Sequence, residues 1–258
     1  MALLEVRGLD KSFGGVTAIA GLHFEVPEGL VYSVIGPNGA GKTTLFNMLS
    51  GIYRPDEGEV HFADQAIVGL QPHRVAALGV SRTFQNLQVF FNMSALENVM
   101  VGCHLRTRSG LFGALARLPS LLKEEREVRD WSLQALEFCG LGELAGRHTG
   151  ELPYGALKRL EIARALAAKP RMLLMDEPAA GLNDTETLEM RTLIRRICES
   201  GVTVLLVEHN MGLVMQVSDR VLVLDYGSRL AEGTPEQVRS NPQVIEAYLG
   251  GEVHYAVE

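Results

Sequence analysis

The chain has 258 residues, of which 47% are hydrophobic and 21% charged, and its formal net charge at pH 7 is −7. This composition is typical of a soluble globular protein, and the acidic balance argues against a nucleic-acid-binding surface, which needs a basic face. No run of about eighteen apolar residues occurs, so the sequence predicts no direct membrane span. The three cysteines (Cys103, Cys139 and Cys198) are far apart, with neither a zinc-site spacing nor a disulfide framework, as expected in a reducing cytoplasm.

The first third of the chain is predicted to be rich in strands. Residues 3–6, 22–26 and 30–35 are predicted strands rich in β-forming residues, and residues 59–62 alternate after a turn at 55–58. The run at 30–35 leads directly into a glycine-rich segment.

That segment matches the phosphate-loop pattern G-x-x-x-x-G-K-[ST], followed by a helix predicted over residues 44–50 that Gly51 ends. Glycines let consecutive backbone N–H groups turn toward phosphate oxygens, the lysine supplies a cation, and the hydroxyl after it can ligate Mg²⁺. A helix N-terminus adds partial positive charge at the same place. The sequence therefore predicts that a nucleoside triphosphate is bound by Gly36, Pro37, Asn38, Gly39, Ala40, Gly41, Lys42, Thr43 and Thr44.

The middle third, from Ser94 to about Leu141, is predicted to be helical. One helix face carries Val128, Trp131, Ala135 and Phe138 at helical spacing. The stretch between residues 103 and 123 contains no acidic residue and four basic ones: Arg106, Arg108, Arg117 and Lys123. This stretch is either a contact with anionic lipid or a membrane partner, or a solvated loop, and the cluster is modest for lipid recognition.

The last third returns to strand–helix alternation. Residues 172–175 and 202–207 are continuous apolar runs typical of buried parallel strands, with a helix between them whose buried stripe is Met190, Leu193, Ile194 and Ile197. The predicted fold is thus α/β, a parallel-sheet ATPase core interrupted by a helical insertion.

Polar residues at the ends of these strands are the candidates for chemistry. Asp176 is predicted to contact Mg²⁺ and Glu177 to act as general base, because phosphoryl transfer needs an acid at a strand end and a group that orients water. His209, after the next strand, either donates to the γ-phosphate, positions Glu177 or is structural. Gln85, at the junction with the helical insertion, is weak evidence alone. The loop and helix at residues 151–166 offer a second helix N-terminus to an anion.

These motifs, in this order, resemble those of the ATP-binding-cassette (ABC) ATPases. The runs at 82–86, 178–183, 233–238 and 247–250 are similar to the LivG-type ATPases of branched-chain amino-acid importers, and the resemblance covers essentially the whole chain. It implies one ABC ATPase domain over 1–258, a P-loop fold with an N-terminal antiparallel β subdomain. The core comprises 1–88 and 160–258, with a helical subdomain at about 89–159.

The resemblance also implies roles. Phe13 is expected to stack on adenine. Thr43 and Asp176 are expected to contact Mg²⁺, and Gln85 to contact Mg²⁺ or water. Glu177 is the expected catalytic base and His209 the expected switch histidine. A signature turn caps the γ-phosphate of a partner's ATP through Leu152, Pro153, Tyr154, Gly155 and Ala156. Here Pro153, Tyr154 and Ala156 depart from the usual Leu-Ser-Gly-Gly-Gln, and Asn183 replaces a common aspartate.

The expected function is therefore ATP hydrolysis with Mg²⁺ that powers import of branched-chain or related amino acids. The expected location is the cytoplasmic face of the inner membrane, where the chain is peripheral. Expected partners are transmembrane permease subunits and a second ATPase subunit in a homo- or heterodimer. Two alternatives stay open: an ATPase of a lipid or lipopolysaccharide exporter, and a soluble ABC ATPase outside transport, which would call for a tandem cassette or a basic face.

Overall fold

The computed structural model describes residues 2–106 and 119–253 and contains two sheets. The smaller sheet is antiparallel, in the order β2-β1-β4-β5. Its strands are β1 (Ala2–Phe13), β2 (Val16–Pro27), β4 (Glu57–Phe62) and β5 (Gln65–Ala66). The predicted strands at 3–6 and 22–26 are parts of one long hairpin, β1–β2, which turns at Gly14 and Gly15.

The larger sheet has six strands in the order β10-β9-β3-β8-β7-β6, and all neighbours are parallel except β9 and β10. Its members are β3 (Val31–Ile35), β6 (Val80–Arg82), β7 (Met172–Asp176), β8 (Thr203–Val207), β9 (Arg220–Asp225) and β10 (Ser228–Gly233). Every residue of β3, β7 and β8 is buried. Burial on both faces explains why these strands are apolar throughout rather than alternating.

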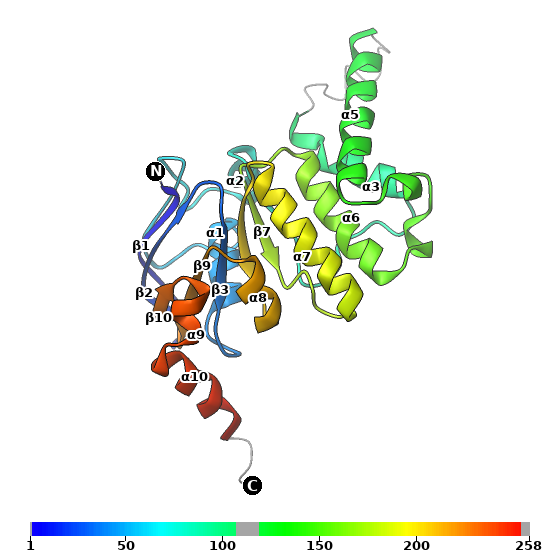
Figure 1. Ribbon diagram of the computed structural model, residues 1–258. Coiled ribbons are helices and arrows are strands. Elements are labelled where there is room, and N and C mark those ends of the chain that lie inside the picture. Colours follow the sequence, from blue (N-terminus) through cyan, green and yellow to red (C-terminus); the bar gives the residue numbers. More distant parts are fainter. Residues whose placement is uncertain (1, 107–118, 254–258) are drawn as a thin grey trace.

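Helices cover this sheet and extend the molecule to one side (Figure 1). The described helices are α1 (Lys42–Leu49), α2 (Pro72–Ala77), α3 (Ala95–Gly102), α5 (Pro119–Phe138), α6 (Tyr154–Ala167), α7 (Asp184–Glu199), α8 (Met211–Val217), α9 (Pro235–Arg239) and α10 (Pro242–Val253). Short 3-10 turns lie at η1 (His104–Arg106), η2 (Gly142–Leu144) and η3 (Thr149–Glu151). α3, α5 and α6 gather on the side away from the antiparallel sheet.

Three groups of buried side chains hold these layers together. One fills the space between the two sheets around α1, and includes Phe24, Phe46 and Phe62. A second joins the six-stranded sheet and α7 to α3, α5 and α6, through residues such as Leu160 and Ile194. The third lies among β9, α8, α9 and α10. The described helices include none that is both long and apolar enough to cross a bilayer.

The predicted α/β fold is confirmed, with small differences at the element ends. The helix predicted over 44–50 begins at Lys42, because the turn at Gly41 already directs the chain into it. The predicted face of α5 is buried at Val128 and Ala135, and Trp131 packs beside them. α6 runs continuously through residues 159 and 160, where the predicted boundary between the helical subdomain and the core lies.

The basic stretch is described only in part. Arg108 and Arg117 lie outside the described residues. The Arg106 guanidinium stacks 3.4 Å from the centroid of the Trp131 ring and donates to the Ala167 carbonyl at 3.0 Å. Lys123 is exposed and lies 3.8 Å from Glu127 on the same helix. Arg106 therefore packs inside the helical part, whereas Lys123 faces solvent.

Candidate functional site

The phosphate loop connects β3 to α1, and its glycines are required by close packing. Gly41 has φ 99°, and a Cβ there would lie 2.4 Å from the Ala18 carbonyl oxygen. A Cβ on Gly36 would lie 2.1 Å from the Leu224 carbonyl oxygen. The loop thus fits between the β2 strand of the antiparallel sheet and the end of β9, where only glycine leaves room.

Lys42 is folded into this loop. Its Nζ donates to the carbonyls of Gly36 and Pro37 at 2.7 and 2.9 Å. Burial lowers the pKa of Lys42, and the charges of Glu177 and Asp176 partly oppose that shift. Both predicted acids therefore act electrostatically on the lysine of the phosphate loop, although more than 130 residues of chain separate them from it.

Asp176 ends β7 and is paired with an arginine that the sequence analysis did not single out. Arg82, at the end of the neighbouring β6, donates to Asp176 Oδ2 at 2.9 Å, and both side chains are buried. Arg82 also donates to the Asn47 side chain of α1 at 2.7 Å. Burial raises the pKa of Asp176, and Arg82 acts against that rise. The sequence signal was a basic residue within a strand that pairs with β7.

Glu177 contacts the two other predicted catalytic residues, Gln85 and His209. Gln85 Nε2 donates to Glu177 Oε2 at 2.9 Å, and His209 Nε2 lies 3.0 Å from Glu177 Oε1. The Glu177 backbone has φ 49°, and its N–H donates to the Val207 carbonyl at 2.9 Å. Each carboxylate oxygen therefore has its own neighbour, and the strand ends of β7 and β8 bring these groups together.

The signature turn is only partly exposed. Pro153 and Tyr154 face solvent, whereas Leu152, Gly155 and Ala156 are buried. A Cβ on Gly181 would lie 3.1 Å from the Tyr154 ring, so this turn contacts the loop that follows Glu177. The helix after it also reaches the catalytic group, because Lys158 Nζ donates to the Gln85 carbonyl at 3.0 Å. Lys158 was not predicted, since nothing local marks its long-range contact.

Phe13 ends β1 at the hairpin whose other strand contacts the phosphate loop. Its ring is 43% exposed and meets Tyr53 edge-on, with centroids 5.3 Å apart. Lys11 Nζ lies 5.3 Å from the same ring. Phe13 therefore presents a partly exposed aromatic surface at the end of β1.

The predicted Mg²⁺ ligands form an oxygen-donor set of the kind that this cation takes. Thr43 is exposed on the first turn of α1, Asp176 supplies a carboxylate, and the Gln85 amide keeps its oxygen while its nitrogen bonds Glu177. No group of three or more His, Cys, Asp or Glu side chains within residues 2–106 and 119–253 could form a closed metal site. A magnesium ion is usually held by one or two carboxylates together with substrate phosphates, and Asp176 is one such carboxylate at this edge of the sheet.

A glycine-rich loop with a lysine, facing carboxylates at the ends of adjacent parallel strands, defines a P-loop nucleoside triphosphatase. The ABC transporter family model matches residues 19–180, and a model of the branched-chain amino acid ATP-binding cassette transporter matches residues 228–254. The chain belongs to the ABC transporter ATP-binding family and is an ATPase.

Relatives match over nearly their whole length. The high-affinity branched-chain amino acid transport ATP-binding protein BraF of Pseudomonas aeruginosa is 47% identical over 249 residues, covering 96% of this chain and 98% of the relative. LivG of Escherichia coli K12 is 46% identical with the same coverage. A nucleotide-free ATP-binding cassette of an ABC transporter superposes with a TM-score of 0.84 at 34% identity, covering 96% of this chain and 99% of that one. The predicted resemblance is therefore confirmed.

The packing of Gly41 generates the first prediction. Gly41→Ala should lower ATP affinity by more than about tenfold, because the added Cβ meets the Ala18 backbone and a left-handed φ costs an L-residue about 1 kcal/mol or more. Titration with a fluorescent ATP analogue measures the effect. Gly146→Ala is the matched control, since a Cβ there meets nothing within 4 Å, and its affinity should equal that of wild type. Equal affinities for the two variants would contradict the packing argument.

Proposed function

We propose that this chain hydrolyses ATP to power the import of branched-chain or related amino acids through a membrane transporter. Support comes from relatives that match it over 96% of its length and are named as branched-chain amino acid transport ATP-binding proteins. The match at residues 228–254 to a model of that transporter class points the same way. Its place is the cytoplasmic face of the inner membrane, where partner subunits hold it.

One observation carries the mechanism: Glu177 lies between Gln85 and His209, next to the phosphate loop. Glu177 is the general base that takes a proton from the attacking water. Gln85 contacts one of its two carboxylate oxygens and His209 the other, so the two neighbours together orient the carboxylate. Lys42 and the loop amides bind the phosphates.

Thr43, Asp176 and Gln85 would hold Mg²⁺, whose bound charge would neutralise the developing negative charge on the phosphate oxygens. Arg82 favours the ionised form of the Asp176 carboxylate and orients it at the end of β7, because it donates to one of the two carboxylate oxygens. Phe13 stacks on the adenine ring at the outer edge of the site.

The chain acts as a dimer in which the signature turn of one ATPase subunit completes the site of the other. Pro153 and Tyr154 are exposed on this turn, and Pro153 supplies no side-chain bond to the first turn of α6. Backbone N–H groups at a helix start suit the phosphate of a facing nucleotide. Because the serine and glutamine of the usual signature are absent, we favour a heterodimer with a second ATPase subunit.

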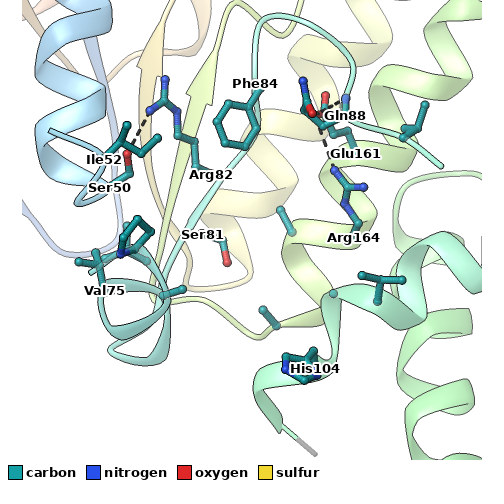
Figure 2. Close-up of a pocket in the computed structure, with 18 of the residues that line it drawn as sticks. Ser50, Ile52, Val75, Ser81, Arg82, Phe84, Gln88, His104, Glu161 and Arg164 are labelled. Atoms are coloured by element: carbon teal, nitrogen blue, oxygen red, sulfur yellow. Dashed lines mark hydrogen bonds and ion pairs between the residues drawn. The ribbon is translucent and has the colours of Figure 1, made fainter. Parts of the chain in front are cut away.

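The permease subunits dock in a cavity of about 560 Å³ between α2, the segment after β6, α3 and α6 (Figure 2). Its walls include the apolar side chains of Val75, Phe84 and Val101, with Val101 41% exposed. Arg164 and the buried Glu161 face one another at its side. Since this segment also carries Gln85, a partner seated here touches the loop that reaches Glu177.

The base role of Glu177 generates a second prediction. Glu177→Gln should keep ATP binding and lower turnover by about 10²–10⁴-fold, the usual worth of a general base, while the ATP-bound dimer accumulates. Steady-state phosphate release and size-exclusion chromatography with ATP measure the two effects. Turnover near that of wild type would remove Glu177 from this role.

Docking generates a third prediction. Val101→Glu should reduce the yield of permease subunits that co-purify with the chain, because it places a charge in an apolar wall, while ATP affinity stays unchanged. Ile245→Glu, at an exposed position of α10, is the control and should retain the partners. Mass spectrometry of the purified complex identifies the subunits and the bound solute. A complex retained by Val101→Glu would contradict the docking site, and a solute unrelated to amino acids would contradict the importer.

The unusual signature generates a fourth prediction. The purified chain alone should hydrolyse ATP slowly and without cooperativity, and turnover should rise when the second ATPase subunit is added. Phosphate release over a range of ATP concentrations measures both rate and cooperativity. Brisk cooperative hydrolysis by the isolated chain would favour a homodimer.

A further inference from the structure

Glu208 is a buried carboxylate between the end of β8 and His209, with only 3% of its surface exposed. Its oxygens accept three backbone N–H groups. Oε1 accepts from Ala179 at 2.7 Å, and Oε2 accepts from His209 and Asn210 at 3.0 and 3.3 Å. Burial raises the pKa of Glu208, and these three amides oppose the rise because they stabilise the charged form.

The three amides belong to two different segments. Ala179 lies in the loop that follows Glu177, and His209 with Asn210 forms the turn that leads into α8. One carboxylate thus joins the segment of the base to the segment of the histidine beside it. Asn210 extends the link, since its side chain accepts the Leu213 N–H and begins α8.

The Glu177 backbone needs such a restraint. Its φ of 49° is a left-handed conformation that a residue with a side chain adopts only when its surroundings hold it there. The Val207 carbonyl fixes the Glu177 N–H on one side of the turn. Glu208 fixes Ala179 two residues later, so the turn that carries Glu177 is held at both ends by the end of β8.

We propose that Glu208 is a positioning residue that keeps the Glu177 loop and the His209 turn in a single arrangement during ATP hydrolysis, an inference that rests on the proposed function. Its oxygens are occupied by backbone amides, so it acts through Glu177 and His209 and not on the phosphates. The same loop reaches the signature turn, because Gly181 packs against Tyr154.

The test uses Glu208→Gln in the purified transporter complex. The change keeps the size of the side chain but replaces one acceptor oxygen by an NH₂ group, which then faces an N–H donor. We expect kcat to fall about tenfold or more, as for loss of hydrogen bonds to a charged acceptor, with KM for ATP within about twofold of wild type. Glu246→Gln, an exposed glutamate on α10, is the matched control and should change neither constant.

Hydrogen exchange of the backbone amides separates positioning from stability. In Glu208→Gln the amides of residues 178–182 and 208–210 should lose protection together, while those of residues 39–44 keep theirs. Three results would overturn the inference: a kcat equal to that of wild type, a change in KM as large as the change in kcat, or loss of hydrogen-exchange protection throughout the chain. If the wild-type complex hydrolyses no ATP, the proposed function itself fails. That result comes from the wild-type protein alone, so it is distinct from any result obtained with the variant.

Discussion

Parallel pairing of β3, β8 and β7 is the constraint on which the site depends. Parallel strands deliver their carboxyl ends to one edge of a sheet, so the phosphate loop after β3, the acids after β7 and the histidine after β8 have to meet there. The register is specific: Asp176 pairs with Val207, one residue before Glu208. Main-chain hydrogen bonds among buried residues therefore fix the distance between groups that lie far apart in the sequence.

Charges at this edge are numerous for a region so little exposed to water. Arg82, Lys158, Asp176 and Glu208 are all largely buried, and each contacts a group of opposite charge or a backbone dipole. An isolated charge in such surroundings would cost several kcal/mol, so each depends on its partner's position. Removing one of these groups would leave its partner buried and unpaired. This cost favours the arrangement in which every buried charge keeps its partner.

The sequence predicted the features that depend on neighbouring residues and missed the side-chain contacts between distant parts of the chain. The phosphate loop, the buried strands and the face of α5 follow from glycine spacing and apolar periodicity, which act over fewer than about twenty residues. Gln85 was proposed from its place at the junction with the helical insertion and His209 from its place at a strand end, and both from family resemblance. No role was assigned to Arg82, Lys158 or Glu208 from the sequence, because an arginine, a lysine and a glutamate carry no local mark of burial; each has a partner between 29 and 94 residues away.

The departures from the usual motifs have different physical weights. Asn183 replaces an aspartate, yet its side chain accepts the Glu186 N–H at 2.9 Å and Glu186 returns a bond to the Asn183 N–H, a complete capping box for α7. Asparagine and aspartate cap helices about equally well, so this exchange costs the loop little. The signature turn differs in kind: Pro153 and Tyr154 are exposed on the surface that we propose faces a partner's phosphate, and Pro153 lacks an N–H group altogether. The change at Asn183 preserves a contact within the chain, whereas the change at Pro153 removes a donor from the surface offered to a partner. The signature turn is therefore where this chain should differ most from one with the usual signature.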